Sequence, residues 1–362
     1  MPSTEMTSTT TTKIRIDDGT GKPPLLVPFT KPAAAPISIK SVVLIYNPVG
    51  GRRKAQKLAD EIVLPTLEEA GIKVTVHKTT HAGHEAEMGQ SLDLSEVDAI
   101  LAMGGDGTCS NLLSGFLTRT DKPTVAVGFL PAGTGNTYMR EVLGEKVIGG
   151  CESGMRAALK AIIGGHTRRV DAFKCSMTAT DGTTPLVRFA LNTVMLGFGP
   201  DANAVAETRR WLGPARYSVS VKTEILKLPC RKKSPCTLTL DSNAPKEMDL
   251  FLIALQNNKH TGVKHRIAPE AQLDNGLVDV LYTPKPVRSI LKAAALDAMV
   301  QSGGSHIHNA IVKYEKASTV AVDAPKPTRI MLDGDIVGYT PLKLEVLAQA
   351  FLLLTPEHPQ PS

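Results

Sequence analysis

Three glycine-rich loops hold the residues of this chain that are best suited to binding phosphate. They are residues 47–51 (NPVGG), 104–108 (GGDGT) and 131–136 (PAGTGN). Glycine lets the backbone come close to a ligand, so successive N–H groups can point at phosphate oxygens. A single Gly-Gly pair is more often only a tight turn. Three such loops at one edge of a sheet would instead indicate a phosphate or nucleotide site.

Each loop follows a short apolar segment that is typical of a buried strand. These segments are 42–46, 99–103 and 125–129, with a fourth at 74–77, and amphipathic stretches lie between them. Strands that alternate with helices indicate a parallel sheet covered on both faces. Because the carboxyl ends of its strands meet at one edge, we expect the three loops to lie together there.

The pattern changes after Arg168, where β segments are separated by Pro, Gly, Asn and Asp turns. The predicted segments are 170–177, 187–196, 237–240, 250–256, 277–282, 311–314, 320–322 and 330–332. One helical interruption is predicted at 287–300. This half of the chain is therefore predicted to be mostly antiparallel β.

The first 38 residues have a different composition from the rest of the chain. They contain a Thr/Ser run at 7–12 and a Pro/Ala-rich stretch at 31–36. Such a composition cannot bury enough apolar surface to order itself, so 1–38 is predicted to be a disordered tail. A transit peptide is the alternative, but Glu5, Asp17 and Asp18 have the wrong charge for one.

Composition excludes several classes of protein. Aromatic residues make up only 4% of the 362 residues, which leaves little for stacking on bases, so nucleic acid is not an expected partner. The five cysteines are spread out without a CxxC pair, which argues against a disulfide framework or a zinc site. The apolar runs are far below the ~18 residues of a membrane span. We expect a cytoplasmic protein that is at most peripheral on membranes.

The ordered set of motifs resembles the diacylglycerol kinase and sphingosine kinase superfamily of lipid kinases. In the first half the resemblance rests on Asn47-Pro48, 79–84 (TTHAGH), 104–108 and 131–136. In the second half it rests on 207–217 (ETRRWLGPARY), 267–281 (IAPEAQLDNGLVDVL), 304–307 (GSHI), 332–335 (LDGD) and Thr340-Pro341. It covers residues 40 to 355. The GGDGT loop alone is shared with NAD kinases and phosphofructokinases.

This resemblance implies a fold and an activity. It implies a Rossmann-like α/β nucleotide-binding domain at 39–168 and an antiparallel β-sandwich domain at 169–356 that carries the lipid pocket. ATP would bind in the cleft between them, and its γ-phosphate would pass to a lipid hydroxyl with Mg²⁺ as cofactor. Phosphoryl transfer mainly requires that the protein position the groups and neutralise charge.

The resemblance also assigns roles to residues. Asp106 would be the base that accepts the proton of the lipid hydroxyl, although a helix N-cap is the structural alternative. Asp333 and Asp335 would hold Mg²⁺, although Asp-Gly-Asp is also a common hairpin turn. The nucleotide site would be formed by Asn47, Pro48, Val49, Thr79, Gly83, Gly104, Gly105, Gly107, Thr108, Gly133, Thr134, Gly135, Asn136, Arg210, Arg216, Asp333, Gly334 and Asp335.

Some positions depart from the family pattern and leave the lipid substrate open. Asp335 stands where the family commonly has Glu. Thr137 replaces the Asp of bacterial diacylglycerol kinases, which favours a sphingoid base. Asn203 aligns with the Asp that binds the ammonium of sphingosine, and nearby Asp201 could supply the missing charge. The 210–217 block (RWLGPARY) looks like that of ceramide kinases. Sphingoid base, diacylglycerol and ceramide therefore all remain candidate acceptors.

Two further readings stay open. An NAD kinase would explain the GGDGT loop but not the 267–281 and 332–335 blocks. A catalytically dead lipid-binding module is suggested by Asn203 and Asp335. The basic loop 230–236 (CRKKSPC) is a solvated hairpin tip or a membrane contact. The histidines at 81, 84, 306 and 308 are not expected to bind a metal. The sequence carries no signal for an oligomeric state.

Overall fold

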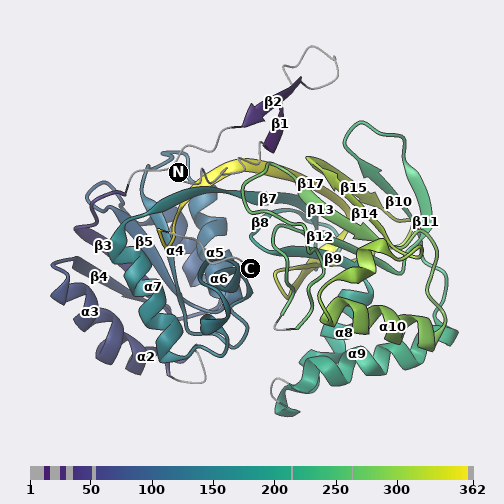
Figure 1. Cartoon of the computed structure of the whole chain (residues 1–362), viewed down its shortest axis with the longest axis horizontal. Coiled ribbons are helices and arrows are strands. Elements are labelled where there is room, and N and C mark those ends of the chain that lie inside the picture. The colour runs from purple at the N-terminus through teal and green to yellow at the C-terminus, as the bar shows by residue number, and fades with distance from the viewer. Residues whose placement is uncertain are drawn as a thin grey trace, which may run out of the picture.

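The computed structural model describes residues 12–16, 25–29, 36–50, 54–212, 215–262 and 264–357. Figure 1 shows an α/β part and a β-rich part, joined by the two long strands β7 (Thr167–Ala179) and β17 (Asp335–Leu354). This arrangement confirms the predicted fold class, an α/β half followed by an antiparallel β half.

The first part is built on the predicted parallel sheet. Its strands are β3 (Ser41–Tyr46), β4 (Lys73–Lys78), β5 (Ala99–Gly104) and β6 (Ala126–Pro131), in the order β4-β3-β5-β6. All three pairings are parallel. Nearly every residue of β3, β5 and β6 is buried, which explains why they are continuous apolar runs in the sequence.

Helices cover both faces of this sheet. Helix α3 (Leu64–Glu69) packs on α7 (Glu152–Gly164), whereas α4 (His84–Ser91) packs on α5 (Asp106–Leu117). The remaining elements are α2 (Ala55–Leu58), the π-helical turn η1 (Ala59–Val63), α6 (Thr137–Leu143) and the short turn η2 (Glu145–Val147). Each glycine-rich loop thus lies between a buried strand and a helix.

The second part is antiparallel, as predicted. Its other strands are β8 (Pro185–Ala190), β9 (Thr193–Gly197), β10 (Pro235–Leu240), β11 (Lys246–Asp249), β12 (Leu252–Gln256), β13 (Val278–Tyr282), β14 (Lys313–Ala317), β15 (Thr319–Asp323) and β16 (Arg329–Leu332). The alternating burial of β10 and β15 matches strands that have one face on the core.

Helices in this part were only partly predicted. The expected helix is α10 (Ile290–Gln301), followed by the turn η5 (Ser305–His308). Two further helices, α8 (Phe198–Glu207) and α9 (Ala215–Lys227), lie where no helix was predicted, with the turns η3 (Arg210–Leu212) and η4 (Leu228–Cys230) after them. In Figure 1 α8, α9 and α10 form one group beside the β strands.

Strand β17 connects the two parts. It pairs antiparallel with β7, β15 and β16, and near its end Leu353 pairs parallel with Val127 of β6. Residues at both ends of the predicted second domain, such as Val170 and Phe351, pack in the core of the first. The predicted boundary at 168/169 follows the order of the chain, but we propose that the cores meet along β7 and β17.

The predicted disordered tail is wrong for two segments. Strand β1 (Thr12–Ile16) and strand β2 (Leu25–Phe29) form an antiparallel hairpin. Both segments contain apolar residues, whereas the prediction was based on the average composition of residues 1–38. The tail predictions for 1–11, 17–24 and 30–35 lie outside the described residues. Within the described ranges, no helix is both long and apolar enough to cross a membrane.

Helices α4 and α5 approach each other through glycine. A Cβ atom added at Gly115 would collide with the backbone carbonyl of Ala86, and one added at Gly89 would collide with the carbonyl of Leu112. Because backbone atoms line both contacts, a side chain cannot be accommodated by a rotamer change. This contact fixes the helix that begins at Asp106.

We therefore expect Gly115→Ala to lower the free energy of unfolding by about 2 kcal/mol or more, in the range of overpacked cores. Gly164→Ala in α7 is the matched control, because its added methyl would lie 3.5 Å from His166. That variant should be unchanged or stabilised by up to about 1 kcal/mol, from helix propensity. Urea unfolding of both variants measures the difference, and equal stabilities would refute the close-contact argument.

Candidate active site

The predicted loops lie at one edge of the parallel sheet. Residues 47–50, 79–83, 104–107 and 131–136 follow the carboxyl ends of β3, β4, β5 and β6. The chain passes from β3 to β4 on one side and returns to β5 on the other. The β3 and β5 loops therefore flank the switch point, where open α/β sheets bind ligands.

The second and third loops are in backbone contact. The amide groups of Ala132 and Gly133 donate to the carbonyl of Gly104, at 2.8 and 3.1 Å. A Cβ atom on Gly133 would collide with the Cα of Gly105, and one on Gly104 would overlap the side chain of Thr108. Glycine is therefore required at 104 and 133 for these loops to meet.

The first loop and the loop after β4 have defined turns. Asn47 accepts a hydrogen bond from the amide of Val49 at 3.0 Å, and the amide of Gly50 donates to the Asn47 carbonyl. Thr79 is buried, and its amide donates to Tyr46. Gly83 precedes α4 with a φ of 85°, which favours glycine. These predicted nucleotide-site residues lie at the expected edge.

Asn136 has a different role from the one predicted. Asn136 is 1% exposed and has a φ of 49°. Its side-chain amide donates to the carbonyls of Gly133 and Val147, at 2.9 and 2.7 Å, and its Oδ1 accepts from the amide of Gly133. Because both ends of the amide are used inside the loop, Asn136 shapes the third loop and does not fit as a direct ligand of the nucleotide.

Asp106 lies at the junction of the second and third loops. Its Oδ2 accepts from the amide of Thr137 at 2.9 Å, and its Oδ1 accepts from the amide of Tyr138 at 3.0 Å. Asp106 therefore caps the N-terminus of α6, in agreement with the structural alternative of a helix N-cap. Each carboxylate oxygen can accept more than one hydrogen bond, so this arrangement leaves capacity for a further donor.

Two glycines lie close to the carboxylates of Asp106 and Asp335. A Cβ atom on Gly135 would lie 3.3 Å from Asp106 Oδ2, and one on Gly107 would lie 3.7 Å from Asp335 Oδ2. Asp335 is the first residue of β17, in the second part of the chain. The structure thus brings Asp335 to the first turn of α5, which begins at Asp106.

The carboxylate of Asp333, a predicted metal ligand, accepts hydrogen bonds on both of its oxygens. Its Oδ1 accepts from the amides of Asn192 and Thr193, at 2.8 and 2.9 Å. Its Oδ2 accepts from the amide of Leu191 at 2.8 Å and from the hydroxyl of Ser110 at 2.6 Å. Both oxygens are thus occupied by hydrogen-bond donors. Burial raises the pKa of Asp333, and these four donors oppose that effect.

The Asp-Gly-Asp motif also forms the hairpin turn that was the alternative reading. Leu332 pairs with Asp335 across the β16–β17 hairpin, with Asp333 and Gly334 between them. Their φ angles are 49° and 103°. Positive φ at both central residues is typical of a two-residue hairpin loop, in which Asp-Gly is favoured.

The two predicted substrate residues have different surroundings. Asn203 donates from Nδ2 to the carbonyl of Gly334 at 2.7 Å, which places it beside the hairpin that carries Asp335. Asp201 instead forms ion pairs with Arg231 at 2.8 Å and with Arg329 at 3.6 Å. Two arginines therefore already offset the charge that Asp201 was expected to supply.

The arginine block joins α8 to α9. Arg216 pairs with Glu207 at 3.2 Å and donates to the hydroxyl of Tyr217 at 2.7 Å. Arg209, for which no role was predicted, donates to Thr223 at 2.9 Å. Arg210 begins η3, and its side chain lies outside the described residues. Both described guanidinium groups therefore have partners within this helical group.

The carboxylates near the loops differ in whether they could hold a metal ion. Among the described residues no three His, Cys, Asp or Glu side chains form a group that could hold a metal ion. Mg²⁺ usually binds through one or two carboxylates together with substrate phosphates. Asp335, close to the first turn of α5, fits such a ligand, whereas Asp333 does not.

Several polar residues near this site were not predicted. Ser110 and Ser114 follow Asp106 at intervals of four along α5, and that spacing was a usable signal for one helix face. Glu141 on α6 pairs with Lys259 at 3.2 Å and lies 3.6 Å from His260. The polar run 256–260 (QNNKH) after a buried strand was the signal for these partners.

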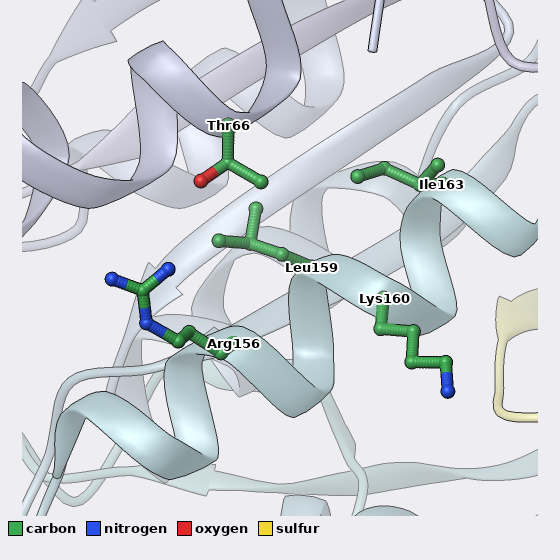
Figure 2. Close-up of a pocket in the computed structure, with 5 residues that line it drawn as sticks. All are labelled: Thr66, Arg156, Leu159, Lys160 and Ile163. Atoms are coloured by element: carbon green, nitrogen blue, oxygen red, sulfur yellow. The ribbon is translucent and has the colours of Figure 1, made fainter. Parts of the chain in front are cut away.

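A shallow surface depression lies elsewhere in the first part. Figure 2 shows Thr66 of α3 pointing toward Leu159 of α7, and Arg156, Lys160 and Ile163 of the same helix complete the lining. None of the predicted site residues lines it. This depression between two covering helices is therefore separate from the loop edge that holds the candidate site.

Comparison with known proteins is consistent with this geometry. The family model "Diacylglycerol kinase catalytic domain" matches residues 41–175, and "YegS C-terminal NAD kinase beta sandwich-like domain" matches 192–355. Sphingosine kinase 1 of Arabidopsis thaliana is 26% identical over 346 residues, covering 83% of this chain and 69% of that protein. Diacylglycerol kinase of Bacillus subtilis is 26% identical over 311 residues, covering 84% and 92%.

A solved structure has the same fold. A diacylglycerol kinase from Bacillus anthracis superimposes with a TM-score of 0.64 at 19% identity, covering 88% of this chain and 98% of that chain.

Proposed function

The chain belongs to the lipid kinase superfamily that includes diacylglycerol and sphingosine kinases, and we propose that it transfers the γ-phosphate of ATP to a hydroxyl of a sphingoid base. One observation carries the proposal of a catalytic site. Asp106 lies where two glycine-rich loops meet, and Asp335 of the second domain reaches the same helix turn. That juxtaposition suits phosphoryl transfer between a nucleotide and an acceptor.

Asp106 is the proposed general base. Two amides of α6 hold its carboxylate in one orientation, and the N-terminal end of that helix favours negative charge. The flanking glycines, Gly107 and Gly135, place no side chain between this carboxylate and an acceptor hydroxyl. A carboxylate fixed in this way can accept the hydroxyl proton while the oxygen attacks the γ-phosphorus.

The glycine-rich edge is the proposed nucleotide site. Backbone amides of the loops at 105–107 and 134–135 are the groups that would face the phosphates, because those of Val49, Gly50 and Gly133 donate within the loops. Helix α5 begins directly after its loop, so its N-terminal end adds favourable charge there. Mg²⁺, where bound, would neutralise phosphate charge, and Asp335 is the residue that would hold it.

One resemblance favours the sphingoid acceptor. Thr137, whose amide holds Asp106, stands where the resemblance leads us to expect Asp in bacterial diacylglycerol kinases. The relatives named sphingosine kinase and those named diacylglycerol kinase both align over more than four-fifths of this chain, so alignment length does not separate the two acceptors. The Oδ1 of Asn203, beside the Asp335 hairpin, could accept a hydrogen bond from a head group.

Diacylglycerol is the second candidate, for an electrostatic reason. An ammonium on the acceptor requires a carboxylate partner, but position 203 is neutral and Asp201 is paired with two arginines. A neutral glycerol head group avoids the cost of an unpaired charge. Ceramide, whose amide is also neutral, is favoured by the same argument.

We propose peripheral membrane contact through the helical group of the second part. Large apolar side chains are exposed there: Trp211 is 81% exposed, Leu226 68% and Leu291 83%. Lys232 and Lys233 follow α9 in the predicted basic loop and are exposed. Apolar side chains flanked by lysines suit the interface of an anionic bilayer, at about 1 kcal/mol for each basic residue.

The first functional prediction concerns Asp106. Asp106→Asn should lower kcat by about 10² to 10⁴-fold, because the amide cannot accept the hydroxyl proton, while the Kd for ATP stays within a few-fold. Asp323→Asn, at the exposed last residue of β15, is the control and should keep full activity. Transfer of radiolabel from ATP to lipid in micelles, and to NAD as a rival acceptor, measures kcat. Normal turnover in Asp106→Asn would remove Asp106 from this role.

The second concerns the arginine block. Arg216→Ala should raise the KM for ATP about tenfold and lower kcat, since each tenfold change corresponds to ~1.4 kcal/mol of a charge-assisted phosphate contact. Arg209→Ala is the control, because that guanidinium likewise contacts the same helical group, through Thr223. It should change little. Equal, small effects in steady-state kinetics would show that Arg216 only stabilises the α8–α9 connection.

The third concerns the acceptor. Asn203→Asp should raise kcat/KM for sphingosine relative to diacylglycerol by tenfold or more, because it restores a carboxylate opposite the ammonium. Asp201→Asn should leave that ratio unchanged, since Arg231 and Arg329 already offset Asp201. The measurement is kcat/KM for sphingosine, ceramide, diacylglycerol and monoacylglycerol, each in mixed micelles. An unchanged ratio in Asn203→Asp, or a native preference for diacylglycerol, would reject the sphingoid assignment.

A further inference from the structure

One face of α5 connects the proposed base to the second part of the chain. Asp106, Ser110 and Ser114 follow at intervals of four, so their side chains share that face. The Ser110 hydroxyl donates to Asp333 Oδ2 at 2.6 Å. The Ser114 hydroxyl donates to the Phe189 carbonyl at 3.2 Å and accepts from the Phe189 amide at 3.1 Å. Each turn after Asp106 is thus attached to the β-rich part.

The partner of Ser110 is itself held firmly. Three consecutive amides, those of Leu191, Asn192 and Thr193, donate to the Asp333 carboxylate within 2.9 Å. The amide of Asp333 also donates to the Thr193 carbonyl at 2.9 Å. Side chain and backbone of Asp333 are therefore both anchored to the turn between β8 and β9. The carboxylate presented to Ser110 has little freedom to move.

The same residue controls where Asp335 lies. Asp333 and Gly334 form the two-residue turn before Asp335, so anchoring Asp333 anchors the start of β17. Asp335 then approaches Gly107 in the first turn of α5. One carboxylate thus sets the position of both ends of the proposed site, Asp106 through Ser110 and Asp335 through the hairpin.

The other helix that holds Asp106 has a parallel connection. Helix α6, whose amides bind Asp106, carries Glu141, which pairs with Lys259 beyond β12. The neighbouring Asn258 donates to Asn192 Oδ1 at 2.6 Å, and Asn192 is one of the residues that hold Asp333. Both helices that contact Asp106 are therefore connected to the turn between β8 and β9, α5 through Ser110 and Asp333, and α6 through Glu141 and the segment that holds Lys259 and Asn258.

We propose that Asp333 is a positioning residue, which holds the hairpin of Asp335 against helix α5 and so fixes the spacing of Asp335 and Asp106 through Ser110. This proposal rests on the proposed function, because it gives that spacing a catalytic purpose. Asp333 itself touches no reacting atom. Its loss would misalign donor and acceptor, and small displacements of positioned groups reduce the rate by ~10²-fold.

The test compares two serines on the same helix face. Ser110→Ala removes only the link to Asp333 and leaves the three amide contacts of that carboxylate in place. Ser114→Ala, the matched control, removes a link to β8, which holds no proposed site residue. We expect Ser110→Ala to lower kcat tenfold to a hundredfold with KM for ATP and lipid within threefold, and Ser114→Ala to keep kcat within threefold.

Hydrogen exchange supplies a readout that requires no activity. In Ser110→Ala we expect exchange to become at least tenfold faster in both 104–112 and 331–336, and in Ser114→Ala we expect both segments to exchange as in the unchanged protein. Unchanged exchange in Ser110→Ala overturns the link. So does a kcat that falls equally in both variants. If the unchanged protein phosphorylates no lipid, the proposed function fails, while the exchange comparison still decides whether Asp333 couples the two segments.

Discussion

The carboxylate of Asp333 is the constraint on which the arrangement of the candidate site depends. It accepts hydrogen bonds from three amides of the β8–β9 turn and from the hydroxyl of Ser110 on α5. Hydrogen bonds to an ionised group are stronger than neutral ones, contributing about 1.5–3 kcal/mol each. A donor left without its acceptor would carry the full cost of desolvation. Because four donors converge on one side chain, α5 and the β16–β17 hairpin hold one relative position.

That constraint acts together with the long strands. Strands β7 and β17 pass through both cores, and β17 ends beside β6 in the parallel sheet. The two parts are thus joined by a continuous sheet along one side and by the contacts of Asp333 and Glu141 near the loops. The loop edge, with Asp106 between α5 and α6, lies between these connections. A lipid kinase requires such rigidity, because phosphoryl transfer depends mainly on alignment.

The sequence predicts local features well and long-range contacts poorly. The buried strands and the loops after them follow from apolar runs and glycines, which act over a few residues. Helices α8 and α9 were missed because their apolar positions are interrupted by the motif residues between 197 and 217. Asp333 was interpreted as a metal ligand from the family resemblance, although Asp-Gly-Asp is equally compatible with a hairpin turn. Its partner Ser110 is 223 residues away, and no local pattern encodes that pairing.

The electrostatics near the hairpin bear on how an acceptor can be selected. The charge of Asp201 is offset by Arg231 and Arg329, while Asn203 uses one N–H on Gly334 and keeps the amide oxygen and its second N–H for a ligand. An amide oxygen accepts from a hydroxyl and from an ammonium alike, so it favours neither strongly. Discrimination by charge is therefore weak at this position. We propose that selection among lipids depends instead on apolar contacts with the lipid chains. Such contacts separate similar chains by only about 1–3 kcal/mol, so one site of this kind would accept several related lipids.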